Sequence, residues 1–166
     1  MATYTAKQYS AELDRRIKSF AQSKALADCV LETHRLQINR LFIQGEGADG
    51  KLGTYSKAYA ARKRKAGREA NFVNFNFTDF LQNDFANSIT KKGNTYVTGV
   101  KNVRNPNPPP AANGKPSKSK GATNSEKVDY LKQRYGAQAF DLTKEEREFF
   151  SDCITETLLD YLRGEK

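Results

Sequence analysis

Residues 143–163 read TKEEREFFSDCITETLLDYLR, and this stretch decides the fold. Thr143, followed three residues later by Glu146, forms a capping box that is typical of a helix start. Apolar side chains then recur at spacings of three and four residues, which predicts a buried helical face. This face comprises Phe150, Cys153, Ile154, Leu158, Tyr161 and Leu162. The exposed side is expected to be acidic and to comprise Glu145, Glu146, Glu148, Asp152, Glu156 and Asp160.

The N-terminal region has the same helical character. No Pro or Gly interrupts residues 5–44, and the apolar residues again recur at helical spacing. The first face comprises Tyr9, Leu13, Ile17 and Phe20, and a similar stripe continues from Leu26 to Leu41. The pattern fits one long helix or two helices that break near Gln22 and Ser23. Residues 45–50 contain three glycines and are expected to form a mobile loop.

The middle of the chain predicts shorter elements. Residues 72–77 partly alternate Phe with Asn, which favours an extended, half-buried segment. Thr78 and Asp79 can cap a short helix, and the runs 87–90 and 95–100 around Gly93 predict a β-hairpin. Residues 125–135 predict a further helix. The expected fold class is therefore α+β, as a single domain over residues 1–166.

Residues 102–124 differ in composition from the rest. All five prolines lie there, together with several Lys and Ser residues and almost nothing apolar to bury. Such a segment is expected to be a flexible Pro/Lys/Ser-rich arm within the domain. It is a candidate for ordering only against a neighbouring subunit or DNA.

Charge is concentrated in one part of the chain. The net charge of +9 divides into +1 for residues 1–50, +11 for residues 51–120 and −3 for residues 121–166. A strongly basic segment attracts polyanions. Basic and acidic regions can also pair between copies of one chain. A solvated surface without a partner is the third explanation.

The densest cluster of cations is the candidate interaction site. Ser56 can cap a short helix that Gly67 ends, and six cations fall between residues 57 and 68. They would surround most of the helix, so they cannot all pair with one protein strand, and phosphate contact or a solvated collar is expected. The cluster as a whole is the candidate for nucleic-acid or inter-subunit contact. The predicted contact residues are Lys57, Arg62, Lys63, Arg64, Lys65 and Arg68.

The residues needed for catalysis are scarce. His34 is the only histidine and is expected at the surface or its boundary, so a Cys or Ser nucleophile has no obvious base. The basic middle offers only Glu69, Asp79 and Asp84 as acids, which is a thin supply for a two-metal nuclease site. The prediction is therefore no enzyme, no cofactor and no metal, with a small nuclease kept as a minor alternative.

The two cysteines and the hydropathy of the chain indicate the kind of cellular compartment in which the protein is found. Cys29 and Cys153 lie in helical segments among apolar neighbours and are expected to be buried free thiols, with a disulfide as the minor alternative. No signal pattern opens the chain and no apolar stretch is long enough to span a bilayer. We therefore expect a protein that is made and kept in a reducing, soluble compartment, away from membranes.

The order of several short motifs resembles a known protein class. LGTYS (52–56) precedes the basic run 57–65, FVNF (72–75) and TDFLQNDF (78–85) follow, and after the hairpin come YLKQRYG (130–136) and FDLT (140–143). This order, over about residues 40–163, is similar to that of the neck or tail-completion proteins of tailed bacteriophages, the head–tail connector class.

The resemblance implies a virion structural protein without catalytic residues. An α+β protomer of this class would assemble as a ring at the portal–tail junction, made in the host cytoplasm and retained in the virion. Its implied partners are other copies of itself, portal or tail proteins, and packaged double-stranded DNA held through its phosphates. The alternative function is a sequence-independent nucleic-acid-binding accessory protein.

Overall fold

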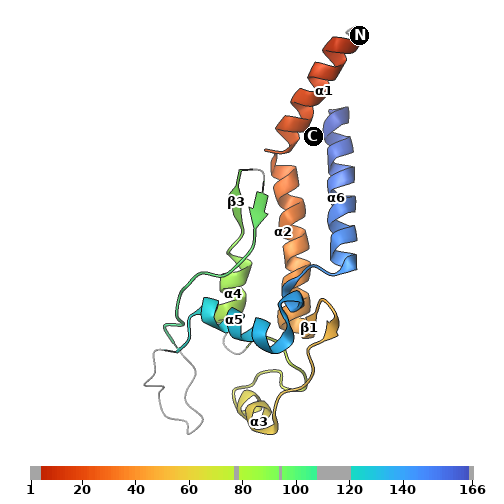
Figure 1. Cartoon of the computed structure of the whole chain (residues 1–166). Helices are drawn as coiled ribbons and strands as arrows, with labels where there is room; N and C mark the ends of the chain where they lie inside the picture. Colours follow the sequence, from red (N-terminus) through yellow and green to blue (C-terminus); the bar gives the residue numbers. More distant parts are fainter. Residues whose placement is uncertain (1–4, 77–78, 94, 108–120, 165–166) are drawn as a thin grey trace.

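The computed structural model describes residues 5–76, 79–93, 95–107 and 121–164. Within these residues the fold is α+β, as predicted, with six α-helices and two small antiparallel hairpins. The molecule is elongated, with α1 at one end and α3 at the other (Figure 1). Helix α6 runs beside α2, and shorter elements gather around the far end of α2 (Figure 1).

The N-terminal region forms two helices, so the alternative with a break near Gln22 and Ser23 is confirmed. Helix α1 spans Ala6–Phe20 and α2 spans Lys24–Ile38. The Ser23 hydroxyl accepts a hydrogen bond from the Leu26 backbone N–H at 3.3 Å, which caps the start of α2. The predicted apolar face of α1 is largely exposed, because only Phe20 is buried, against the Tyr161 ring.

Helix α2 continues into a π-helical turn, η1 (Asn39–Gln44), which ends at Gly45. Gly45 has a φ of +68°, and a Cβ there would lie 2.2 Å from the carbonyl oxygen of Val73. Only glycine fits so close an approach of two backbone segments. The predicted loop that follows forms a tight antiparallel hairpin, β1 (Glu46–Gly47) with β2 (Gly50–Lys51).

The C-terminal helix α6 spans Lys144–Arg163 and begins with the predicted capping box. Its apolar face packs against α2 and α1. Glu146 departs from the expected acidic exposed side because it is buried. The other acids predicted on the exposed side behave as expected or nearly so. Asp160 is half-buried, and the exposed ones are Glu145, Glu148, Asp152 and Glu156.

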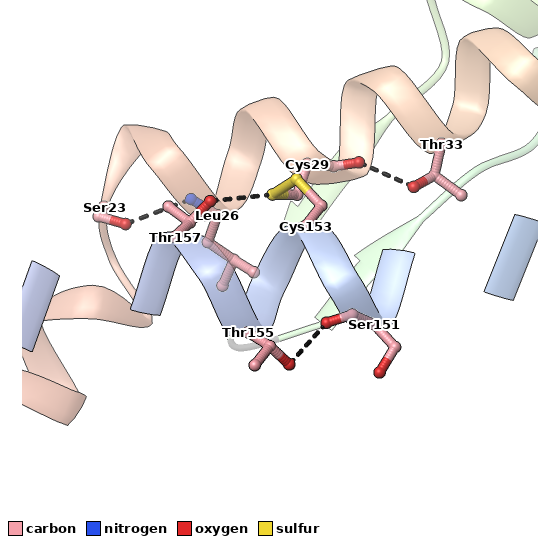
Figure 2. The surroundings of a disulfide bond; sticks show 8 residues. All are labelled: Ser23, Leu26, Cys29, Thr33, Ser151, Cys153, Thr155 and Thr157. Carbon is pink, nitrogen blue, oxygen red and sulfur yellow. Dashed lines mark hydrogen bonds between the residues drawn. A yellow bond between two sulfur atoms is a disulfide. The ribbon is translucent and has the colours of Figure 1, made fainter. Parts of the chain in front are cut away.

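A disulfide joins Cys29 of α2 to Cys153 of α6, so the prediction of two free thiols is wrong. Figure 2 shows the bond between the two helices, with Thr157 of α6 beside the Cys29 sulfur at 3.6 Å. The two Cα atoms are 5.8 Å apart, a separation typical of disulfides. The two cysteines are 124 residues apart in sequence, so only the antiparallel packing of α2 and α6 brings them together.

The main core lies at the far end of α2. It joins η1 to the segment 73–75 and to helix α4 (Phe80–Ala86). Its buried members are Leu41, Phe42, Val73, Phe75, Leu81 and Phe85. Residues 72–76 of the predicted half-buried segment form no strand, residue 77 lies outside the described residues, and Val73, Asn74 and Phe75 are all buried. Phe75 stacks on Phe140 at 5.3 Å between ring centroids.

His34 is also in this core, so its predicted surface position is wrong. Its Nδ1 lies 3.1 Å from Gln37 Oε1, and its Nε2 lies 3.0 Å from the Phe85 carbonyl oxygen. The ring packs on Phe85 at 4.8 Å between centroids. The histidine therefore ties α2 to α4.

The predicted β-hairpin is confirmed as β3 (Thr90–Lys92) with β4 (Thr95–Val97). The predicted helix near the C-terminal third is α5 (Asn124–Tyr135), followed by the short 3₁₀ turn η2 (Ala137–Phe140). Of the predicted arm, residues 108–120 lie outside the described residues. Its two ends meet, because Arg104 pairs with Thr123 and the Asn124 N–H donates to the Val103 carbonyl at 2.8 Å.

A buried ion pair holds these elements together. The Arg40 Nε donates to Glu146 Oε1 at 2.8 Å, and the two side chains are only 8% and 6% exposed. The remaining guanidinium N–H groups donate to Glu146 Oε2 and to the carbonyl oxygens of Glu46, Ala139 and Asp141. Glu146 Oε2 also accepts the Thr143 N–H of the capping box at 2.9 Å. One guanidinium therefore joins η1, β1, η2 and the start of α6.

Replacing Arg40 should destabilise the protein strongly. The Arg40→Met variant leaves the Glu146 carboxylate buried without its partner, which costs about 3–5 kcal/mol. Chemical denaturation of the variant and the parent chain measures this loss. The control is Arg35→Met, which removes an exposed pair with Glu32 and should cost less than about 1 kcal/mol. Equal losses in the two variants would contradict the structural role of Arg40.

The disulfide predicts a thiol count. The protein unfolded without reductant should show no free thiol, and reduction should release both. The Cys29→Ser/Cys153→Ser variant should lose about 2–5 kcal/mol of stability, because the unfolded chain is no longer cross-linked. Its melting temperature should not respond to reductant, whereas that of the parent should fall. Two reactive thiols in the unreduced protein would show that the bond does not form.

Candidate functional site

Helix α3 (Lys57–Lys65) carries most of the predicted contact residues. The Ser56 hydroxyl caps its start by accepting the Tyr59 N–H at 3.4 Å, and Gly67 follows its end with a φ of +67°. Four cations occupy its last turn, where they interact favourably with the helix dipole. Sequence and local structure therefore agree on this element.

The structure divides the six predicted contact residues into three groups. Lys57, Arg64 and Lys65 are exposed, which leaves them available to a polyanion or an acidic partner. Arg62 and Arg68 are half-buried. Lys63 is fully buried, with an exposed fraction of 0%, so it departs from the predicted contact set.

Lys63 instead fastens α3 to the core. Its Nζ donates to Asn74 Oδ1 at 2.5 Å, to the Asn76 carbonyl at 2.7 Å and to the Tyr55 hydroxyl at 3.0 Å. It also lies 4.5 Å from the centroid of the Tyr55 ring. Burial disfavours the charged ammonium and lowers the pKa of Lys63 to about 8. No carboxylate contacts this cation among its described hydrogen-bond partners.

Arg68 is also a structural residue. Its guanidinium donates to both carboxylate oxygens of Asp79, at 3.0 Å and 2.8 Å. Asn76 donates to the same carboxylate at 2.7 Å. These two donors, Arg68 first, hold the pKa of Asp79 below its usual value. Asp79 has a φ of +59°, so the pair holds the backbone turn that leads into α4.

The acids considered for a nuclease are each held by internal donors. Asp84 accepts the Lys101 N–H and the Asn124 side-chain amide, both at 2.9 Å, and Asp79 is held by Arg68 and Asn76. Across residues 5–76, 79–93, 95–107 and 121–164, no group of three His, Cys, Asp or Glu side chains is placed to hold a metal ion.

A cavity of about 710 Å³ opens between α3, the segment 73–76 and α5. Its lining includes five aromatic residues, three cations and two carboxylates. We call this cavity the α5 cavity. The aromatic and cationic residues of its lining that are used below are Tyr59, Arg62, Phe75, Lys127, Tyr130 and Arg134.

The cations of the α5 cavity that come from α5 are paired with neutral groups. Lys127 donates to Asn124 Oδ1 at 3.0 Å, and Arg134 donates to the Tyr130 hydroxyl at 3.2 Å. The two carboxylates at the rim, Asp79 and Glu126, are already engaged, by Arg68 and by the capping box of Thr123. The cavity is therefore an aromatic pocket with a positive rim.

Sequence reasoning did not single out the α5 residues of this cavity. Lys127, Tyr130 and Arg134 recur at spacings of three and four, which places them on one helical face. That spacing was the available signal. It carried no information on the pairing of α5 with α3, because the two helices are separated by about sixty residues.

The buried Lys63 predicts a pH-dependent stability. Its pKa in the folded protein is about 8, below its unfolded value of about 10.4, so the unfolded state binds the proton more tightly. The stability of the parent relative to a Lys63→Met variant should therefore be lowest below pH 8 and rise between pH 8 and about pH 10.4. Thermal melts of both chains across this window measure the difference. The exposed Lys65→Met substitution is the matched control, and an unchanged difference across the window would contradict burial of Lys63.

Comparison of the chain with models of protein families, with curated proteins and with solved structures finds no match. Among the described residues, no helix is long and apolar enough to cross a membrane.

Proposed function

We propose that this chain is a structural protein of a tailed-bacteriophage neck or tail, and that copies of it assemble as a ring around the DNA channel. The observation that carries the proposal is the separation of charge on an elongated protomer. The basic helix α3 lies at one end of the molecule, and the acidic helix α6 lies beside α2, away from α3 (Figure 1).

Such a protomer suits contact between unlike surfaces of neighbouring copies. A basic surface on one copy attracts an acidic surface on the next, and this fixes their register. Contacts between unlike surfaces generate rings when the rotation between copies closes. The order of the short motifs, from LGTYS (52–56) to FDLT (140–143), supports a place in the neck or tail.

Exposed cations support DNA as the content of the ring. Lys57, Arg64 and Lys65 point away from the core at the end of the molecule. Phosphates are held by such cations without regard to sequence. Facing a channel, these residues would neutralise packaged DNA, while Lys63 and Arg68 keep α3 fixed to the protomer.

The test is a count of copies in purified particles from the source of the chain. Quantitative mass spectrometry, normalised to the major structural proteins, should give a fixed copy number that matches a ring symmetry. A low and variable number would indicate a contaminant rather than a structural component. Absence from particles would overturn the proposal.

The exposed cations also favour the second candidate, a sequence-independent nucleic-acid-binding protein. In that case a single copy should bind duplex DNA, and the Lys57→Ala/Arg64→Ala/Lys65→Ala variant should bind it more weakly, with a smaller salt dependence. A protomer that binds well alone and is absent from particles would establish this candidate in place of the ring.

A further inference from the structure

Helix α6 carries an exposed stripe that combines acids with large apolar side chains. Phe149 is 40% exposed and Leu159 is 46% exposed, although both belong to a helix that packs against the body of the molecule. Their spacing places them on the same face as four exposed acids. The α6 acidic stripe comprises Glu145, Glu148, Phe149, Asp152, Glu156 and Leu159.

Within the part of the chain that the structure describes, one ion pair involves an acid of this stripe. Glu148 pairs with Lys144 at 3.6 Å, but both side chains are largely exposed, and such pairs contribute little. A helix with exposed apolar side chains can dock them into a hydrophobic groove of a partner. Such a groove would need a positive rim to match the acids.

The α5 cavity has these properties. Tyr59 and Tyr130 are exposed at its opening, with Tyr130 57% exposed, and Phe75 forms part of its wall. Arg62, Lys127 and Arg134 supply the positive charge. The stripe extends about 21 Å along α6 and α5 is about 18 Å long, so the two are matched in length.

The two surfaces lie on different sides of one protomer. Helix α6 packs along one side of α2, whereas α4, the hairpin β3–β4 and α5 lie on the other side in Figure 1. A copy cannot therefore fill its own cavity with its own stripe. Each copy offers one cavity and one stripe, which is the condition for head-to-tail assembly.

We propose that the α5 cavity of one copy binds the α6 acidic stripe of the next, with Phe149 as the anchor among the tyrosines and Asp152 and Glu156 facing Arg62 and Arg134. This inference deepens the ring proposal and rests on it, because it names the two surfaces that join neighbouring copies. The contact buries an aromatic side chain in an aromatic pocket and pairs acids with cations at the rim.

Two variants of the full chain each remove one surface. The cavity variant, Tyr130→Ser/Arg134→Ser, replaces two exposed side chains of α5, and the stripe variant, Phe149→Ser/Asp152→Ser, replaces two exposed side chains of α6. Serine carries neither charge nor an apolar ring, so the two altered surfaces cannot pair with each other. The control variant, Lys92→Ser/Lys101→Ser, removes two exposed cations that lie outside both α3 and the α5 cavity.

Sedimentation velocity over a range of concentrations at low salt measures the assembly. The parent chain and the control variant should form oligomers larger than a dimer, and each surface variant alone should stay monomeric. An equal mixture of the two surface variants should form a one-to-one pair and nothing larger, because only one intact cavity and one intact stripe can meet. Circular dichroism confirms that each variant is folded.

The outcomes separate this inference from the ring proposal. If the parent chain assembles and both surface variants assemble equally well, other surfaces join the copies, so the inference is wrong while the ring remains. A parent chain that stays monomeric at every concentration also overturns the inference, and the copy number in particles then judges the ring. Single-stranded DNA binding that only the cavity variant loses would assign the cavity to nucleic acid instead.

Discussion

The fold depends on one buried guanidinium. Arg40 uses its N–H groups on Glu146 and on three backbone carbonyls from β1, η2 and the residue that follows η2. A buried charge is tolerated only when it is paired and fully hydrogen-bonded, so these segments have little freedom to move separately. Because η2 directly follows α5, the same residue indirectly sets the position of the helix that forms one wall of the α5 cavity.

A second buried cation, Lys63, fixes helix α3, which forms the other wall of the α5 cavity. Lys63 holds α3 through Tyr55, Asn74 and Asn76, and its four-carbon stem allows an ammonium to reach three acceptors from a helix face. The cation is stabilised by neutral hydrogen-bond acceptors and by the Tyr55 ring, and none of its described hydrogen-bond partners is a carboxylate. The basic helix therefore contributes one charge to its own anchoring and leaves its exposed cations to face a partner.

The sequence predicted elements better than their contacts. Helical spacing predicted α5, a capping box with helical spacing predicted α6, and turn residues predicted the hairpin β3–β4, because these signals are local. The break near Ser23 was one of two alternatives that the spacing left open. The partners of Arg40 and Lys63 and the Phe85 carbonyl beside His34 lie in other elements, and Arg40 and Glu146 are separated by 106 residues, so no spacing rule reaches them. The exposed acids of α6 followed from periodicity, but the burial of Glu146 among them follows only from where Arg40 lies.

The same distinction explains the cysteines. Their apolar neighbours predicted burial, which is confirmed for Cys29, but not that the two would meet. Meeting requires α2 and α6 to run side by side in one register. Contacts lie beyond both ends of this pairing, between Arg40 of η1 and Glu146 at one end and between Phe20 of α1 and Tyr161 at the other.

The bond between Cys29 and Cys153 also changes the connectivity of the molecule. It closes a covalent loop between two residues that are 124 positions apart, and this loop contains α3, α4, α5 and both hairpins. A single break of the backbone anywhere inside the loop would leave two pieces that are still covalently joined, with α2 and α6 paired as before. Each chain is thus a covalently closed loop with a helical segment at each end. A protease must cut the loop twice, or cut one of these end segments, before it releases a fragment.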